Sequence, residues 1–215
     1  GGTGLTDFGG YFADCMITAE RGKGDFNGVF NGTGTSSFIQ TGIHDDVFSG
    51  HFPVTDQLEN GKLKAGIRSS GGDNTFSGTF MNGSSIEGGS GNDIYNGSFF
   101  DSKINDLGGN NTFGTYIDIK NKVQADFMRT VIESGSGNDK FVGTAEDSTI
   151  KLGGGDDEVD GVLIASTLDA GDGNDKLRLI YASGSFIDMG KGDDDLHLIT
   201  GSGNSVRLGA GNDKM

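Results

Sequence analysis

The chain has 215 residues, of which 41 are Gly and only one is Pro, and 33% are hydrophobic. The scarcity of Pro and the lack of a Gly at every third position exclude collagen, and 15 Phe residues among evenly spaced Ile residues argue against a disordered chain. A net charge of −15 makes nucleic acid and anionic membranes poor partners, and the lone Cys15 excludes an internal disulfide and zinc or iron–sulfur sites built on Cys.

A short Gly-rich phrase recurs along the chain and defines its period. Its six full copies are GSGND at 89–93, GSGND at 135–139, GGGDD at 153–157, GDGND at 171–175, GKGDD at 190–194 and GAGND at 209–213. If the last residue of each phrase is position zero, weaker relatives end at Asp46, Asn74 and Asn111. The spacings are 18 or 19 residues apart from two of 28, which predicts a repeat protein.

Three columns of side chains follow the same frame. Seven residues before zero stand Ile39, Ile67, Ile86, Ile104, Ile132, Ile150, Leu168, Ile187 and Val206. Two residues after zero stand Phe48, Phe76, Tyr95, Phe113, Phe141, Val159, Leu177, Leu196 and Met215. Both of these columns are expected to face inward. Nine residues before zero stand Ser37, Ser84, Ser102, Ser148, Ser166 and Ser185, which are expected to hydrogen-bond from coil to coil at the opposite edge.

The local pattern favours strands over helices. A Gly pair in each repeat and a β-branched column are unfavourable in a helix, whereas Ile150-Lys151-Leu152 alternates with strand period. One strand pair and two turns per coil, stacked at about 4.8 Å, predict an all-β parallel β-solenoid, a β-roll or β-helix of about nine to ten 18–19-residue coils.

In chain order, residues 1–85 are predicted to form degenerate coils with room for a cap. The turn at 22–26 is one residue short, His44 stands where Gly is expected and Asn74 replaces Asp, so this part is expected to be free of metal. Extra sequence at 51–60 and 116–129 accounts for the 28-residue spacings and is expected to leave the coils laterally.

Residues 86–215 are predicted to continue the same solenoid as coils of a calcium-binding type. Met215 ends the sequence at an inward column without a polar capping repeat, so we expect a segment of a longer chain. Phe99-Phe100 and Phe127-Met128 are expected in a cap or insert core rather than in a binding patch.

The Gly-rich turn has the chemistry of a calcium site. Calcium takes six to eight oxygen ligands, and the Gly residues allow backbone carbonyls to converge while the Asp at zero adds a carboxylate. One turn has about half of the required oxygens, so each ion is expected to bridge two stacked turns, with Asp93 as an isolated half-site because Asn111 lacks a carboxylate. The predicted metal-binding residues are Gly89, Gly91, Asp93, Gly135, Gly137, Asp139, Gly153, Gly155, Asp157, Gly171, Gly173, Asp175, Gly190, Gly192, Asp194, Gly209, Gly211 and Asp213.

The phrase resembles the nonapeptide G-G-x-G-x-D-x-U-x of the repeats-in-toxin (RTX), or hemolysin-type calcium-binding, family. The resemblance covers residues 86–215 and implies a right-handed parallel β-roll that folds with calcium outside the cell. It also implies a secreted Gram-negative toxin, protease, lipase or adhesin exported by a type I route. Here, however, the second half of each coil lacks the phrase and reads SFFDSKI at 98–104 or TAEDSTI at 144–150, so calcium is expected along one edge only.

The sequence therefore predicts a non-catalytic calcium-binding β-solenoid segment of a large secreted bacterial toxin or adhesin. Its predicted partners are calcium ions and the rest of the same polypeptide, with a cell-surface or glycan receptor as a further candidate, and membrane insertion by this segment is not expected. No cofactor other than Ca²⁺ is expected, and His44, His51 and His197 share no spacing that would gather them on one metal.

Two alternatives stay open. Stacked Asn and Asp turns exist without any ion, which would make the chain a calcium-free structural fibre segment. A β-helix enzyme acting on polysaccharide, such as a lyase or epimerase, would use the acidic residues with calcium, although Arg129, Arg178 and Arg207 share no column that would mark a substrate groove.

Overall fold

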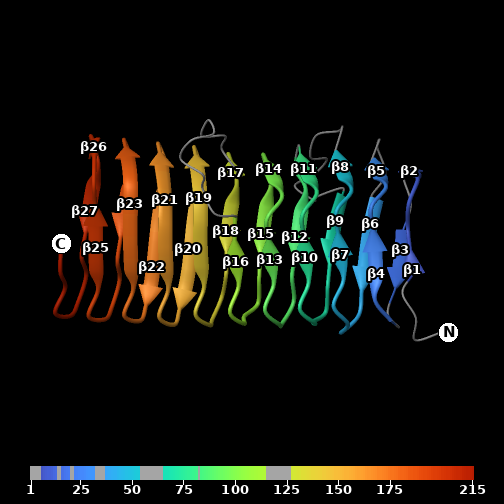
Figure 1. Ribbon diagram of the computed structural model, residues 1–215, viewed down its shortest axis with the longest axis horizontal. Coiled ribbons are helices and arrows are strands. Elements are labelled where there is room, and N and C mark those ends of the chain that lie inside the picture. The colour runs from blue at the N-terminus through green and yellow to red at the C-terminus, as the bar shows by residue number, and fades with distance from the viewer. Residues whose placement is uncertain are drawn as a thin grey trace, which may run out of the picture.

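The structure, a computed structural model, describes residues 6–13, 16–19, 22–31, 37–53, 65–81, 83–114 and 127–215. Within these ranges it contains 27 strands and no helix, and thus no helix long enough to cross a membrane. The strands lie across the long axis and stack in parallel like rungs, from β1 near the N-terminus to β27 near the C-terminus (Figure 1). The predicted fold class, an all-β parallel β-solenoid, is confirmed.

Two sheets form the walls of the stack. The first has ten strands, one from each coil: β3 (Met16–Ala19), β6 (Ser37–Thr41), β9 (Ala65–Arg68), β12 (Ser85–Glu87), β15 (Lys103–Asn105), β18 (Val131–Glu133), β20 (Thr149–Gly154), β22 (Thr167–Asp172), β24 (Phe186–Asp188) and β27 (Ser205–Arg207).

The second sheet has 17 strands, because most coils contribute two short strands to it. The strands that follow the Gly-rich turn are β1 (Thr6–Asp7), β4 (Gly24–Phe26), β7 (Val47–Phe48), β10 (Thr75–Phe76), β13 (Ile94–Tyr95), β16 (Thr112–Phe113) and β25 (Asp195–Leu198). Those that lead to the opposite edge are β2 (Tyr11–Ala13), β5 (Val29–Asn31), β8 (His51–Pro53), β11 (Thr79–Met81), β14 (Ser98–Phe100), β17 (Phe127–Met128) and β26 (Gly201–Ser202). In three coils the two merge into one strand: β19 (Lys140–Glu146), β21 (Glu158–Ile164) and β23 (Lys176–Ser183).

The register of the ten-stranded sheet agrees with the predicted Ile column. Ile86 pairs with Ile67 on one side and with Ile104 on the other, and Leu168 pairs with Ile150 and Ile187. The column is buried from Ile39 to Ile187, because successive strands place equivalent residues directly above one another.

The predicted column after the Gly-rich turn is buried from Phe48 to Leu196. Its aromatic members form a ladder of parallel rings, with ring centroids 4.8 Å apart between Phe48 and Phe76 and 4.9 Å apart between Tyr95 and Phe113. The prediction is wrong at Met215, which is 77% exposed. This last residue of the chain has a column neighbour on one side only.

A second aromatic ladder fills the other half of the core. Phe52, Phe80, Phe99 and Phe127 are buried and stack at 4.8–5.2 Å, and Ala145 and Leu163 extend their column. Phe99 and Phe127 are therefore regular core residues, and the prediction that they belong to a cap or insert core is wrong. The repeat frame of the sequence did not reveal this column, because Phe52, Phe80 and Phe99 stand six residues after position zero, whereas Phe127 stands sixteen residues after Asn111.

The opposite edge is held by the predicted hydroxyl column. The backbone N–H of Ser148 donates to Ser166 Oγ (3.1 Å), and that of Ser166 donates to Ser185 Oγ (3.2 Å). Each hydroxyl in turn donates to a carbonyl, as Ser148 Oγ does to Glu146 O (2.8 Å). Ser37 was predicted in the same column, but its side chain lies outside the described part of the chain, as does Cys15.

The two 28-residue spacings leave the register of the strands intact. Phe80 pairs with Phe52, Phe99 with Phe127 and Phe113 with Phe141. The prediction that 51–60 and 116–129 leave the coils laterally is wrong at 51–53 and 127–128, which lie in strands β8 and β17, and its residues 54–60 and 116–126 lie outside the described residues. The repeat thus tolerates additional chain length between strands that remain aligned.

Candidate metal-binding edge

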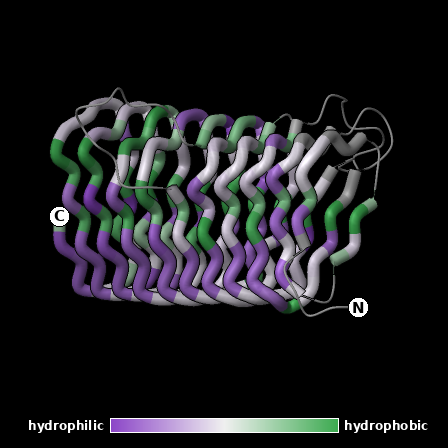
Figure 2. Tube along the Cα trace, turned by 45° about the vertical axis from the view of Figure 1, so that its right-hand side comes forward, coloured by the Kyte–Doolittle hydropathy of each residue, from purple (hydrophilic) through white to green (hydrophobic). Residues whose placement is uncertain are grey.

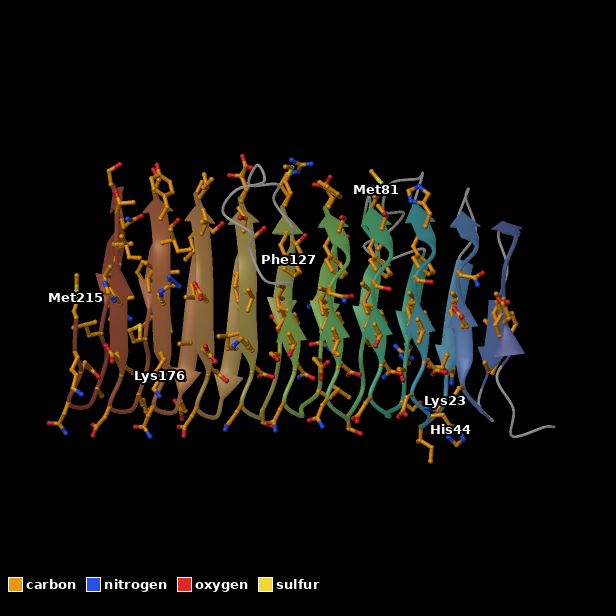
Figure 3. All side chains as sticks on the ribbon, in the orientation of Figure 1. Lys23, His44, Met81, Phe127, Lys176 and Met215 are labelled. Carbon is orange, nitrogen blue, oxygen red and sulfur yellow. The ribbon has the colours of Figure 1, made fainter. Side chains whose placement is uncertain are left out.

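The Gly-rich turns lie together along one edge of the stack. This edge is mostly hydrophilic or neutral in Figure 2, and polar side chains project from it in Figure 3. The Gly residues at positions minus four and minus two have positive φ in all six full phrases, for example 112° at Gly171 and 153° at Gly173. A Cβ at Gly173 would overlap the carbonyl oxygen of Gly155 in the preceding coil, so these positions require Gly both for φ and for close stacking.

An outer ladder connects the turns at their exposed side. It consists of the Asp or Asn residue at position minus one of each turn, whose Oδ1 accepts the backbone N–H of its counterpart in the following coil at 2.7–3.1 Å. Asn174 N, for example, donates to Asp156 Oδ1 (2.8 Å). These side chains replace the carbonyl partners that a turn cannot supply.

An inner ladder runs in the opposite direction and is formed by the residues at position zero. Each Oδ1 accepts a backbone N–H from the preceding coil at 2.6–3.1 Å, as Asp175 Oδ1 does from Asp157 N (2.8 Å). Gly24 N donates to Asp46 Oδ1, so Gly24 takes position zero in its own coil, and Phe26 follows two residues later in register with Phe48. The prediction that the turn at 22–26 is one residue short is therefore wrong, because Gly24 replaces Asp at position zero and no residue is missing between Gly22 and Phe26. The side chains of the inner ladder are buried from Asp46 to Asp194.

The second carboxylate oxygen of the inner ladder has no donor. Oδ2 is buried without a hydrogen-bond partner at Asp46, Asp93, Asp139, Asp157, Asp175 and Asp194. An unsatisfied carboxylate oxygen in a protein interior is costly, and it is offset by a proton or a cation. The inner ladder thus presents a row of oxygens that accept no hydrogen bond from the protein.

Asn residues at position zero show what surrounds this second atom. Asn74 Nδ2 donates to Gly72 O (3.0 Å), Gly88 O (3.2 Å), Ser69 Oγ (3.1 Å) and Asp93 Oδ1 (2.9 Å). In the other Asn turn, Asn111 Nδ2 donates to Gly109 O and Ser134 Oγ, both at 3.3 Å. The place occupied by the second atom is lined with oxygens, which suits a donor or a cation and not a bare carboxylate oxygen.

Burial changes the acidity of the inner ladder. It raises the pKa of Asp157 to about 7 and the pKa values of Asp139 and Asp175 to about 6, against the opposing effect of the hydrogen bond from the preceding backbone N–H. Burial likewise raises the pKa of Asp46 and Asp194. The charged form of each carboxyl group is therefore disfavoured unless a positive charge lies beside it.

The structure also brings a residue to this edge that sequence reasoning missed. Asp106 stands five residues before Asn111, is buried, and accepts the Tyr95 Oη–H in a 2.6 Å hydrogen bond. Asp106 therefore supplies a second carboxylate beside Asp93 from a different repeat position, which the expectation of an isolated half-site at Asp93 did not include. Its signal in the sequence is a charged residue in a column that otherwise holds Thr41, Ser69, Gly88, Ser134, Leu152, Ala170, Met189 and Leu208.

A separate feature lies on the outer face of the 17-stranded sheet. It is a hollow of about 270 Å³ lined by Glu158, Val159, Asp160, Lys176, Leu177, Arg178, Asp195 and His197. Arg178 pairs with Asp160 and His197 across neighbouring strands, and its Nη1 donates to both Asp160 carboxylate oxygens (2.9 Å each). Acidic and basic side chains thus lie together on an exposed face. Arg178 is part of this group even though Arg129, Arg178 and Arg207 do not share one repeat position.

Every predicted metal-binding Gly and Asp lies on the Gly-turn edge. His44 also lies on this edge, beside Gly72, whereas His51 and His197 stand in strands β8 and β25. Among the described residues, no three His, Cys, Asp or Glu side chains gather closely enough to hold a metal ion. An ion at this edge would thus take most of its ligands from backbone carbonyls. Comparisons with family models, with curated proteins and with solved structures each gave no match to this chain.

Proposed function

We propose that this chain is a non-catalytic calcium-binding β-solenoid segment of a large secreted bacterial toxin or adhesin. In this proposal the coils fold as calcium binds along the inner ladder outside a Gram-negative cell. The secreted setting rests on the resemblance of the six phrases to RTX repeats, and the calcium chemistry rests on the geometry of the turns.

One observation carries the proposal: the row of buried, unpartnered Oδ2 atoms. Asp157, Asp175 and Asp194 are consecutive members of this row. A divalent cation between two coils neutralises their charge, and carbonyl oxygens of the Gly turns complete a shell of hard ligands. Because the unfolded chain holds no such site, binding and folding are coupled.

The Asn turns support the same reasoning. Asn74 places an NH₂ group where an Asp turn has Oδ2, and four oxygens lie within hydrogen-bond distance of its nitrogen. A cation in the Asp turns would have the same role that the amide group has in the Asn turns. This also supports the expectation that the N-terminal coils need no metal at Asn74.

The test is a calcium titration of metal-stripped protein followed by far-UV circular dichroism, with the number of ions measured by calorimetry. Calcium is expected to increase strand content cooperatively. Asp175→Ala is expected to damage two shared sites and Asp213→Ala only one, because Asp213 contacts one neighbouring Asp in the ladder. Full strand content without calcium would favour a calcium-free structural fibre, and equal losses in the two variants would contradict sharing between coils.

A polysaccharide-acting enzyme is the second candidate function, and the hollow around Arg178 favours it. Lys176 and Arg178 offer positive charge to a uronate beside the acidic Asp160 and Asp195, and His197 lines the same hollow. Binding of polygalacturonate or alginate fragments, lost in Arg178→Ala but retained in Arg207→Ala, would support this function. Absence of binding in the unmodified protein would remove it.

A further inference from the structure

The coil that contains Asn111 holds a buried group of oxygens unlike those of the other turns. Tyr95 Oη, Asp106 Oδ2 and Asp93 Oδ2 all lie within 2.6 Å of the position that a Cβ of Gly88 would take, so these oxygens fill the place of a side chain next to Gly88 Cα. Asp93, Tyr95 and Asp106 are all buried. Two carboxyl groups and a phenol therefore lie close together against the backbone of Gly88.

The hydrogen bonds at this place leave the charges unbalanced. Asp93 Oδ1 accepts Asn74 N (2.7 Å) and Asn74 Nδ2 (2.9 Å), and Asp106 Oδ1 accepts Gly108 N (3.1 Å). Tyr95 Oη–H donates to Asp106 Oδ2, and Asp93 Oδ2 has no donor. All of these donors are neutral, so among the residues that the structure describes no positive group is hydrogen-bonded to the two carboxyl groups.

We infer that Asp93, Asp106 and Tyr95 form a second kind of cation site, which takes one calcium-like divalent ion. A proton shared by the two carboxyl groups would neutralise only one of the two charges, whereas a divalent cation neutralises both. Carboxylate and phenol oxygens are hard ligands of the kind that calcium and lanthanide ions prefer. Burial, together with the neighbouring Asp106, also raises the pKa of Asp93, in agreement with the close approach of the two carboxyl groups.

This site differs from the row proposed above in the origin of its ligands. In the row, both carboxylates come from position zero of adjacent coils. Here Asn111 occupies position zero, and the second carboxylate comes from Asp106, five residues earlier. The inference rests on the proposed function in one respect, since Asp93 also belongs to the inner ladder, so the experiment must separate the two kinds of site.

Terbium ions provide a suitable probe because they substitute for calcium and emit when a nearby tyrosine is excited. The chain has four Tyr residues and no Trp. With the whole chain we expect terbium emission on tyrosine excitation that added calcium displaces. Asp106→Asn is expected to abolish most of this emission and to lower the calcium count by one. The control Asp157→Asn, which alters only the row, is expected to keep the emission.

A second variant keeps the inference falsifiable if Asp106→Asn does not fold. Tyr95→Phe retains both carboxylates, so we expect the calcium count to stay unchanged while the sensitised emission is lost. The site would be overturned if Asp106→Asn had the same emission and the same calcium count as the unmodified protein. It would also be overturned if the emission persisted in Tyr95→Phe. If Asp157→Asn left the calcium count unchanged, the proposed row of calcium ions along the inner ladder would be overturned. In that case, loss of emission in Asp106→Asn would still support the separate site at Asp93 and Asp106.

Discussion

Each Asx side chain of the inner ladder has two terminal atoms with different roles. Oδ1 accepts a backbone N–H from the preceding coil in Asp and Asn turns alike, as in Asp139 and Asn74. The other atom decides the chemistry, because an NH₂ group finds acceptors there whereas a carboxylate oxygen finds no donor. The identity of this second atom, nitrogen or oxygen, thus decides whether a turn is satisfied by hydrogen bonds within the protein or needs a cation or a proton.

Asp139→Asn tests this distinction. The new amide would lie near Ser134 Oγ and Asp157 Oδ1, the counterparts of the groups that Asn74 contacts, so metal-free protein should gain about 1–3 kcal/mol and lose calcium dependence at this turn. Urea unfolding in a chelator measures the change. Asp156→Asn removes an equal charge from the exposed outer ladder and should alter stability by less than about 0.5 kcal/mol. An Asp139→Asn variant less stable than the parent in chelator would contradict the reasoning.

The Gly residues of the turn are tested by Gly173→Ala. Its φ of 153° and the nearby Gly155 carbonyl exclude a methyl group, so we expect a loss of about 2–5 kcal/mol. Gly184→Ala is the matched control, because Gly184 has a φ of 61° but no atom within 4 Å of a Cβ. It should lose only about 1–2 kcal/mol, the cost of the left-handed conformation alone. Equal losses in thermal unfolding would show that stacking contributes nothing.

At the scale of the strand, the core changes character along the stack. The coils from Phe8 to Phe113 contain stacked rings, whereas the later coils contain Val159, Leu177 and Leu196 at the same position. Both kinds of strand keep one register, because identical repeat positions face one another and a slip by one residue would expose the whole buried column.

Leu168→Asp tests that register. Leu168 is buried between Ile150 and Ile187, so a carboxylate there would have no partner and should cost about 3–5 kcal/mol or more, enough to abolish cooperative folding. The neighbouring Thr167 is partly exposed, and Thr167→Asp should fold like the parent. Circular dichroism melting curves that coincide for the parent and Leu168→Asp would show the register to be wrong.

At the scale of the whole molecule, the inner ladder places a column of acidic groups inside an already acidic chain. Their pKa values in the folded state lie above the ordinary Asp value of 3.8, so the folded protein binds more protons than the unfolded chain in the pH range between these values. The stability that these groups contribute is fully present below about pH 4 and is lost as the pH rises through 6 to 8.

We therefore expect metal-free protein to have more strand content at pH 5 than at pH 8, because protonated carboxyl groups need no cation, and to melt at least about 5 °C higher at pH 5. Saturating calcium should remove this difference by stabilising the carboxylate form at pH 8. Thermal unfolding at the two pH values, with chelator and with calcium, provides the measurement. Identical melting temperatures in chelator would mean that the carboxyl groups of the inner ladder are not held in the buried positions described here.

The sequence by itself determined the repeat, the strand class, the edge on which the Gly turns lie and the inward Ile column, because these depend on periodicity and on local backbone preferences. Only the tertiary structure decided which atoms the repeat brings together. It showed that the zero-position carboxylates are buried, that Phe99 and Phe127 continue one core column, and that Asp106 lies beside Asp93. These contacts join residues in different coils and at different repeat positions, so their distances depend on how the coils stack and cannot be derived from spacing along the chain.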